Sequence, residues 1–228
     1  MSPSMSTTSP VIGTSRPHES ATLHVTGRAP YIDDLPEVAG TLHGALGLSP
    51  VAHGRLVALD LARVRAMPGV VAVLSAADIP GVNDCGPIVH DDPILAEGTV
   101  NWRGQPMFLV VARTRGEARR AAALAAQVAT IEPLPAVLDP LEAHRLQQYV
   151  VPPMHLQRGD AAAAIAAAPH RLEGRFSLGG QEQFYLEGQI AYALPLEQKQ
   201  WWIYSSTQHP GEVQHWVAHA LGIDNHAV

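Results

Sequence analysis

The segment best suited to chemistry lies at residues 179–189, where two glycines precede a run of amides and acids. It reads Gly179-Gly180-Gln181-Glu182-Gln183-Phe184-Tyr185-Leu186-Glu187-Gly188-Gln189. Paired glycines let a backbone approach a bulky group closely, and the neutral amide of Gln181 donates and accepts hydrogen bonds at once. Such a side chain suits an oxo-anion or a metal-oxo centre. From the spacing alone, a β-bulge in which Gln181 satisfies local backbone groups is the commoner use of this pattern.

Nucleotide and zinc chemistry find little support in the sequence. Lys199 is the only lysine and no glycine-rich segment leads to it, so a P-loop is excluded, and no G-x-G-x-x-G motif occurs. His215 and His219 lie four residues apart and therefore on one helical face. No glutamate follows His215, as a metallohydrolase helix would require, so we interpret both histidines as surface residues.

Three further candidates have structural interpretations that we favour. Asp33-Asp34 precede Leu35-Pro36, which is typical of a solvated turn rather than of paired catalytic acids. Gln105 stands just before a long apolar run, so we expect it to bind backbone groups where a strand begins, with a role at a cofactor or subunit boundary as the alternative. Cys85 lies in a polar stretch without neighbouring basic residues, which does not predict a reactive thiol.

Composition limits the kinds of partner and compartment. The 228 residues include 15 Lys and Arg against 21 Asp and Glu, a net charge of −6 that argues against nucleic acid or an anionic membrane as a partner. A single cysteine excludes an intrachain disulfide and the usual iron–sulfur ligation within this chain. Residues 1–19 are expected to form a flexible arm without a signal-peptide core, and no apolar run reaches the length of a membrane span. We therefore expect a cytoplasmic protein.

Short elements punctuated by Gly and Pro must position these residues. A long loop is expected at 82–98, a proline-broken linker near 135–160 and a short helix at 161–168. After His209-Pro210, a helix with an apolar stripe should run to Gly222. Alternating and continuous apolar patterns predict helices over 60–67 and 115–128 and strands over 42–48, 54–59, 70–75, 107–112, 129–132, 171–178, 190–194 and 202–206.

Five segments carry a resemblance to a known family. In order and spacing, the chain from about residue 18 to its end resembles the molybdenum-binding subunit of bacterial xanthine dehydrogenases, within the molybdenum hydroxylase family. Aldehyde oxidoreductases and N-heterocycle hydroxylases share much of the pattern. The segments are GRAPYIDDLP, MPGVVAVLSAADIPG, WRGQPMFLVVA, GGQEQFYLEGQ and SSTQHPGEVQHWVAHALG.

The resemblance implies an α+β architecture in which an α/β hammerhead domain (20–135) is followed by a linker (136–158) and the beginning of a molybdopterin-binding domain (159–228). It implies that the amide of Gln181 approaches molybdenum through an oxo ligand, without being a direct metal ligand, and that Gly180 holds the loop close to the cofactor. Gln183 departs from the histidine common in the family. The base glutamate is expected downstream of Val228, so no catalytic residue is expected in this chain.

The activity implied is hydroxylation of hypoxanthine and xanthine to urate at a molybdenum-molybdopterin centre. Electrons would pass through 2Fe-2S clusters and FAD, both on a partner subunit, to NAD. The expected assembly is a heterotetramer with a second copy of the molybdenum subunit, and the 228-residue chain alone is expected to be inactive. The alternatives are hydroxylation of an aldehyde or another N-heterocycle, and a non-catalytic hammerhead module for assembly.

Overall fold

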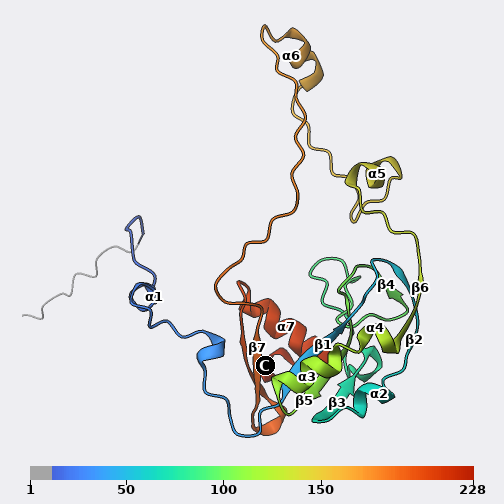
Figure 1. Cartoon of the computed structure of the whole chain (residues 1–228). Coiled ribbons are helices and arrows are strands. Elements are labelled where there is room, and N and C mark those ends of the chain that lie inside the picture. The colour runs from blue at the N-terminus through green and yellow to red at the C-terminus, as the bar shows by residue number, and fades with distance from the viewer. Residues whose placement is uncertain (1–11) are drawn as a thin grey trace, which may run out of the picture.

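Two three-stranded antiparallel sheets form the first unit of the chain (Figure 1). The structure is a computed structural model that describes residues 12–228, so residues 1–11 of the predicted arm lie outside the described residues. One sheet has the order β1 (His43–Leu48), β5 (Pro106–Ala112), β3 (Val70–Leu74), and the other has the order β4 (Thr99–Val100), β2 (Gly54–Leu59), β6 (Ala129–Pro133). The predicted strands of this unit are confirmed, and the two-residue β4 was not predicted.

Strand β5 lies at the centre because its sequence is apolar on both faces. Its residues Met107, Phe108 and Val110 are fully buried, as expected for a strand covered on both sides. Helix α3 (Arg115–Ala122) packs on β1 and β5 through small buried side chains. Thr114 caps this helix, because its hydroxyl accepts the Glu117 amide at 3.2 Å. The resulting core also takes in α2 (Ala62–Arg65) and α4 (Ala125–Val128).

The second unit consists of a hairpin and one helix. Strands β7 (Ala191–Pro195) and β8 (Trp201–Ser205) pair antiparallel across the turn η3 (Glu197–Lys199), as predicted. Helix α7 (Pro210–Leu221) begins with Pro210 and ends at Gly222, whose φ of +65° is a left-handed conformation that glycine adopts without strain. The terminal turn η4 (Asn225–Ala227) packs on α7.

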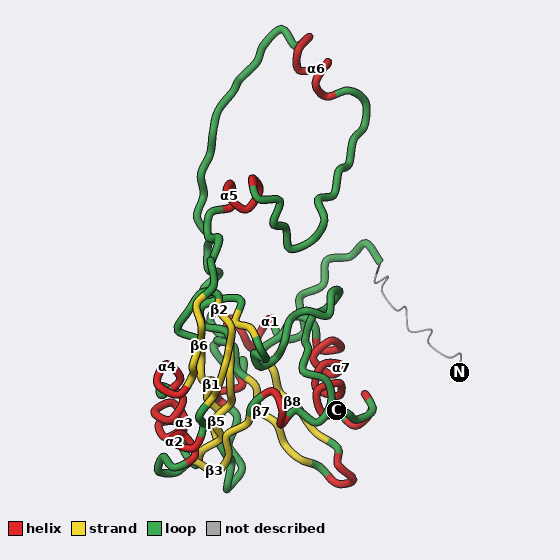
Figure 2. Tube along the Cα trace, turned by 90° about the vertical axis from the view of Figure 1, so that its right-hand side faces the viewer, coloured by secondary structure: helices red, strands yellow, loops and turns green. Residues whose placement is uncertain are grey.

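Between β6 and β7 the chain leaves both units, carries two short helices and returns, as Figures 1 and 2 show. Helix α5 (Pro140–Arg145) was not predicted within the linker; Asp139 caps it by accepting two backbone amides. Helix α6 (Ala161–Ala167) confirms the alanine-rich prediction. The remaining short helical pieces are α1 (Ala21–Val25), η1 (Ile32–Asp34) and η2 (Ala76–Asp78).

Two predictions of secondary structure are wrong. Residues 171–178 form no strand, and Leu172, Phe176 and Leu178 are almost fully exposed. The alternating pattern is present, but no strand among the described residues pairs with this segment, and an isolated strand leaves its N–H and C=O groups unpaired. The predicted helix 115–128 is divided into α3 and α4, with Leu124 half-buried against the core at the break.

Candidate functional site

The Gly180-Gln181 segment is open and exposed in the structure. Residues 179–186 have no regular structure, and within residues 12–228 the Gln181 side chain makes no hydrogen bond. No atom lies within 4 Å of the position that a Cβ would take at Gly179 or Gly180. The segment forms no β-bulge, because it lies outside any strand. A free amide beside such open backbone fits a large group with an oxygen acceptor, such as an oxo ligand of a cofactor.

A cleft of about 820 Å³ brings the two C-terminal motifs together. One wall comes from the residues that follow Gln181, and the other from the end of β8 and the residues between β8 and α7. Tyr31 and Leu46 of β1 add two further side chains. In the sequence, Gly180 and Gln181 come just before the residues that form the first of these walls. The lining residues are Tyr31, Leu46, Tyr185, Leu186, Glu187, Gln189, Ile190, Ala191, Ser205, Ser206, Thr207 and Gln208.

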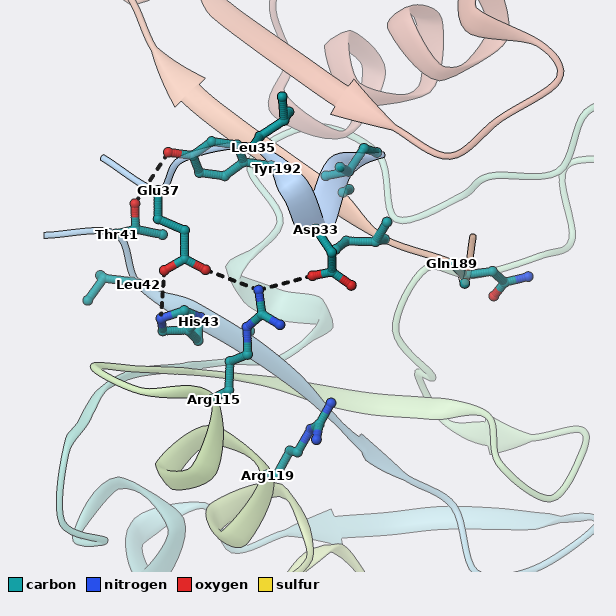
Figure 3. A pocket seen from close by; sticks show the side chains of 15 residues that line it. Asp33, Leu35, Glu37, Thr41, Leu42, His43, Arg115, Arg119, Gln189 and Tyr192 are labelled. Carbon is teal, nitrogen blue, oxygen red and sulfur yellow. Dashed lines mark hydrogen bonds and ion pairs between the residues drawn. The ribbon is translucent and has the colours of Figure 1, made fainter. Parts of the chain in front are cut away.

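Asp33 and Asp34 have separate structural roles rather than a shared catalytic one. An oxygen of Asp33 lies 3.1 Å from Arg115 Nη2, which also binds Glu37 at 3.0 Å (Figure 3). Hydrogen bonds to Glu37 and Asp33 raise the pKa of the Arg115 guanidinium. Asp34 instead accepts the Tyr31 amide at 2.9 Å. The prediction of an exposed turn is confirmed.

Gln105 and the α7 histidines also have structural environments. Gln105 is fully buried, and its Oε1 accepts the Asn101 amide at 2.7 Å, which confirms the predicted backbone contact. Its Nε2 has no hydrogen-bond partner among the described residues. The rings of His215 and His219 stack at 5.9 Å. Within residues 12–228, no three His, Cys, Asp or Glu side chains gather closely enough to hold a metal ion.

Sequence reasoning missed a set of contacts between distant segments. Glu187 Oε1 accepts the Ile32 amide at 2.9 Å, and the Tyr192 hydroxyl accepts the Val38 amide at 3.0 Å. The partners in each pair are separated by more than 150 residues. No local pattern marks such contacts, although both partners of the first pair lie in quoted motifs.

Cys85 lies in a loop organised by its neighbour Asp84. The His90 ring, 2.7 Å away, and the amides of Asp92 and Gly86 hold the pKa of the Asp84 carboxyl below its usual range. Cys85 Sγ donates to the Asp92 carbonyl at 3.3 Å, while burial and the charges of Asp92 and Asp84 raise the pKa of the thiol. This environment favours the unreactive thiol form.

We expect Cys85 to react with maleimide at pH 7 at least about tenfold more slowly than glutathione does, because so little thiolate is present. The same chain unfolded in urea provides the control, and there the thiol should react at the ordinary rate. Mass spectrometry follows the modified fraction over time. Equal rates for the folded and unfolded chains would contradict the protective environment.

The two units also meet at the C-terminal end of α7. The Gly81 amide donates to the Ala220 carbonyl at 2.9 Å, and the Val82 amide donates to the His219 carbonyl at 3.1 Å. The Gly222 amide also donates to the His219 carbonyl, at 3.3 Å, whereas no helical amide is in position to bond the Ala220 carbonyl. The first unit therefore completes the end of α7. A Cβ at Gly81 would lie 2.0 Å from the His219 carbonyl oxygen. Only glycine fits here without displacing the helix.

The Gly81→Ala variant should therefore lower the free energy of unfolding by about 2–3 kcal/mol, through overpacking and weakened hydrogen bonds. Gly211→Ala is the matched control, because no atom lies within 4 Å of a Cβ there and the residue is helical. We expect that control to be neutral or stabilising by up to about 1 kcal/mol. Urea denaturation measures both, and equal stability of the two variants would contradict the steric contact.

Among residues 12–228, no helix combines the length and the apolar character needed to cross a membrane.

Comparison with known families matches both units. Residues 26–130 match the family described as aldehyde oxidase and xanthine dehydrogenase, a/b hammerhead domain, and residues 143–228 match the molybdopterin cofactor-binding domain. These two domain matches are those of the molybdenum hydroxylase class of proteins. The chain belongs to the xanthine dehydrogenase and aldehyde oxidase family, and its α+β fold is that of the family's hammerhead and cofactor-binding domains.

Several relatives are similar over nearly the whole chain. A xanthine dehydrogenase of Dictyostelium discoideum is 36% identical over 92% of this chain, and aldehyde oxidase 2 of Cavia porcellus is 37% identical over 93%. The crystal structure of quinoline 2-oxidoreductase from Pseudomonas putida 86 is 31% identical, with a TM-score of 0.73 over 95% of this chain and 29% of that chain. The chain spans only 15% and 16% of the length of the two curated relatives.

Proposed function

We propose that this chain contributes the hammerhead domain and a cofactor-facing segment to a molybdenum hydroxylase that oxidises hypoxanthine and xanthine to urate. The observation that supports it best is the free amide of Gln181, exposed next to open glycine backbone in a chain of this family. The proposed boundaries are an arm at 1–19, the hammerhead domain at 20–135, a linker at 136–158 and the cofactor-binding region from 159.

Two residues of the segment, Gly180 and Gln181, have a defined task in this proposal. When bound, the molybdenum cofactor supplies the redox chemistry of hydroxylation. The Gln181 amide would donate a hydrogen bond to an oxo ligand, and a neutral donor stabilises that oxygen without adding charge. Gly180 keeps the backbone free of a Cβ that would hold the cofactor away. The base glutamate and the substrate-orienting groups are proposed to lie elsewhere in the complete enzyme.

The most specific part of the proposal is that the substrate is a purine. The resemblance in the five quoted segments favours it, and the identity of 36% to a xanthine dehydrogenase is consistent with it. The identity of 37% to an aldehyde oxidase is just as high, and the quinoline enzyme has the same fold over this chain. An aldehyde or another N-heterocycle is therefore the second candidate substrate.

Electron transfer and assembly complete the proposal. A single cysteine supports placing the 2Fe-2S clusters on a different subunit or segment, together with FAD, and NAD is the proposed acceptor. The proposed assembly pairs two molybdenum subunits with two flavin/iron–sulfur subunits in the cytoplasm, where a lone thiol stays reduced.

The experiment is to purify the native protein from its source and to measure its intact mass and molybdenum content. A mass well above 24.3 kDa with bound molybdenum supports a hydroxylase. Initial rates with xanthine, an aldehyde and a quinoline at equal concentrations then decide the substrate class. A 24.3 kDa protein without molybdenum would overturn the proposal in favour of a non-catalytic assembly module.

A further inference from the structure

One seam joins the residues that follow Gln181 to the N-terminal region of the chain. We define it as residues 31–41 on one side and 187–192 on the other. Glu187 Oε1 accepts the Ile32 amide at 2.9 Å, and the Tyr192 hydroxyl accepts the Val38 amide at 3.0 Å. Figure 3 shows the Tyr192 hydroxyl directed toward Thr41, which belongs to residues 31–41.

Ion pairs connect the N-terminal side of the seam to the first unit. Arg115, at the start of α3, binds both Asp33 at 3.1 Å and Glu37 at 3.0 Å. Residues 31–41 therefore form a strip between α3 and the second unit. The GRAPYIDDLP motif contains much of this strip, and the proposed function leaves the motif without a role.

After Gln181, Glu187 is the first described residue that makes a hydrogen bond. Among the described residues, 179–186 make no hydrogen bonds, whereas Glu187 is half-buried and bound to Ile32. Ile32 begins the turn η1, so its amide has no partner within that turn, and a carboxylate is a stronger acceptor than a neutral oxygen. The next hydrogen-bonded residue is Ile190, which exchanges hydrogen bonds with Ser206.

The position of this contact limits where Gln181 can lie. Glu187 lies six positions after Gln181, a reach of at most about 20 Å. If Glu187 were released, the nearest fixed point would be Ile190, nine positions after Gln181, with a reach of about 30 Å. The accessible volume would grow roughly threefold. In addition, the segment would lose its fixed direction relative to the first unit.

We propose that Glu187 is a positioning residue that fastens the Gln181 segment to the Ile32 amide, so that the hammerhead domain sets where the Gln181 amide meets the cofactor. This inference rests on the proposed function of Gln181. It gives the GRAPYIDDLP motif a role: presenting a backbone amide to the end of the cofactor-facing segment.

The contact itself is tested by hydrogen exchange on the 228-residue chain, without cofactor or activity. Glu187→Ala should speed exchange of the Ile32 amide by about tenfold, the effect of losing a charge-assisted hydrogen bond. Glu187→Gln keeps an acceptor oxygen and should retain most of the protection. Glu173→Ala removes an exposed acid upstream of Gln181 and should match the unmodified chain. Unchanged exchange of Ile32 in Glu187→Ala would overturn the proposal.

Positioning is tested by a double-mutant cycle in the molybdenum-loaded enzyme. Glu187→Ala should lower kcat about tenfold with little change in KM, and Glu187→Gln should restore most of it. In the Gln181→Ala background, Glu187→Ala should cause no further loss, because it acts through Gln181. Additive losses, or a normal kcat in Glu187→Ala beside an impaired Gln181→Ala, would overturn this inference alone. A normal kcat in Gln181→Ala would overturn the proposed role of Gln181 and the positioning with it.

Discussion

Replacing Gln181 by alanine in the molybdenum-loaded enzyme is expected to lower turnover by about 10²–10³-fold. Loss of one preorganised hydrogen-bond donor at a reacting centre has an effect of this size. The fold should be unaffected, because the Gln181 side chain is exposed and makes no hydrogen bond within residues 12–228. We expect a change of less than about 0.5 kcal/mol in the free energy of unfolding. Steady-state kinetics with the preferred substrate measures the loss.

Two controls separate a catalytic loss from other causes. Molybdenum content must equal that of the unmodified enzyme, so that a lost cofactor is not counted as a lost donor. Gln183→Ala removes another exposed amide two residues away, and we expect its turnover to stay within about twofold. Full turnover of a fully loaded Gln181→Ala enzyme would refute the cofactor-facing role.

Most strands of the first unit, the start of α3 and both ends of α7 could be predicted because these elements carry complete local signals. The continuous apolar run of β5 indicates burial on both faces, and the Thr114 cap begins α3 where the sequence places a threonine before an alanine-rich stretch. Pro210 and Gly222 mark both ends of α7. In each case the residues that determine the element lie within it or beside it.

Pairing between distant segments could not be predicted in this way. The period-two pattern at 171–178 describes which side chains share a face, but a strand also needs a neighbour for its backbone groups, and the pattern contains no information about one. The Glu187–Ile32 contact likewise depends on how two segments 155 residues apart meet. The quoted motifs contain both residues, yet only the structure shows that they touch.

The open Gln181 segment is an intermediate case. Paired glycines and an amide indicate that the backbone approaches another group closely, but the sequence allows either a β-bulge or a bound ligand. Residues 179–186 lie outside any strand in the structure, which excludes the β-bulge. The resemblance supplies the cofactor interpretation, and the kinetic experiment on Gln181→Ala decides it.

Stability should depend strongly on the single buried phenylalanine. Phe108 is fully buried at the centre of β5, and its register partner on β1 is Gly47. A Cβ on Gly47 would lie only 2.1 Å from Phe108 Cζ, so the ring lies directly over the glycine. The ring covers the backbone that Gly47, having no side chain, leaves bare. Phe108→Ala should therefore lower the free energy of unfolding by about 3–5 kcal/mol.

The chain contains its own matched control for this substitution. Phe176 is 91% exposed in the 228-residue chain, so Phe176→Ala removes the same atoms from solvent rather than from a core. We expect that variant to change the free energy of unfolding by less than about 0.5 kcal/mol. Urea denaturation of both variants measures the difference. Comparable losses would mean that residues 171–178 are buried in solution, for instance as the strand that their alternating sequence predicts, whereas a large loss in Phe108→Ala alone fits the core around β5.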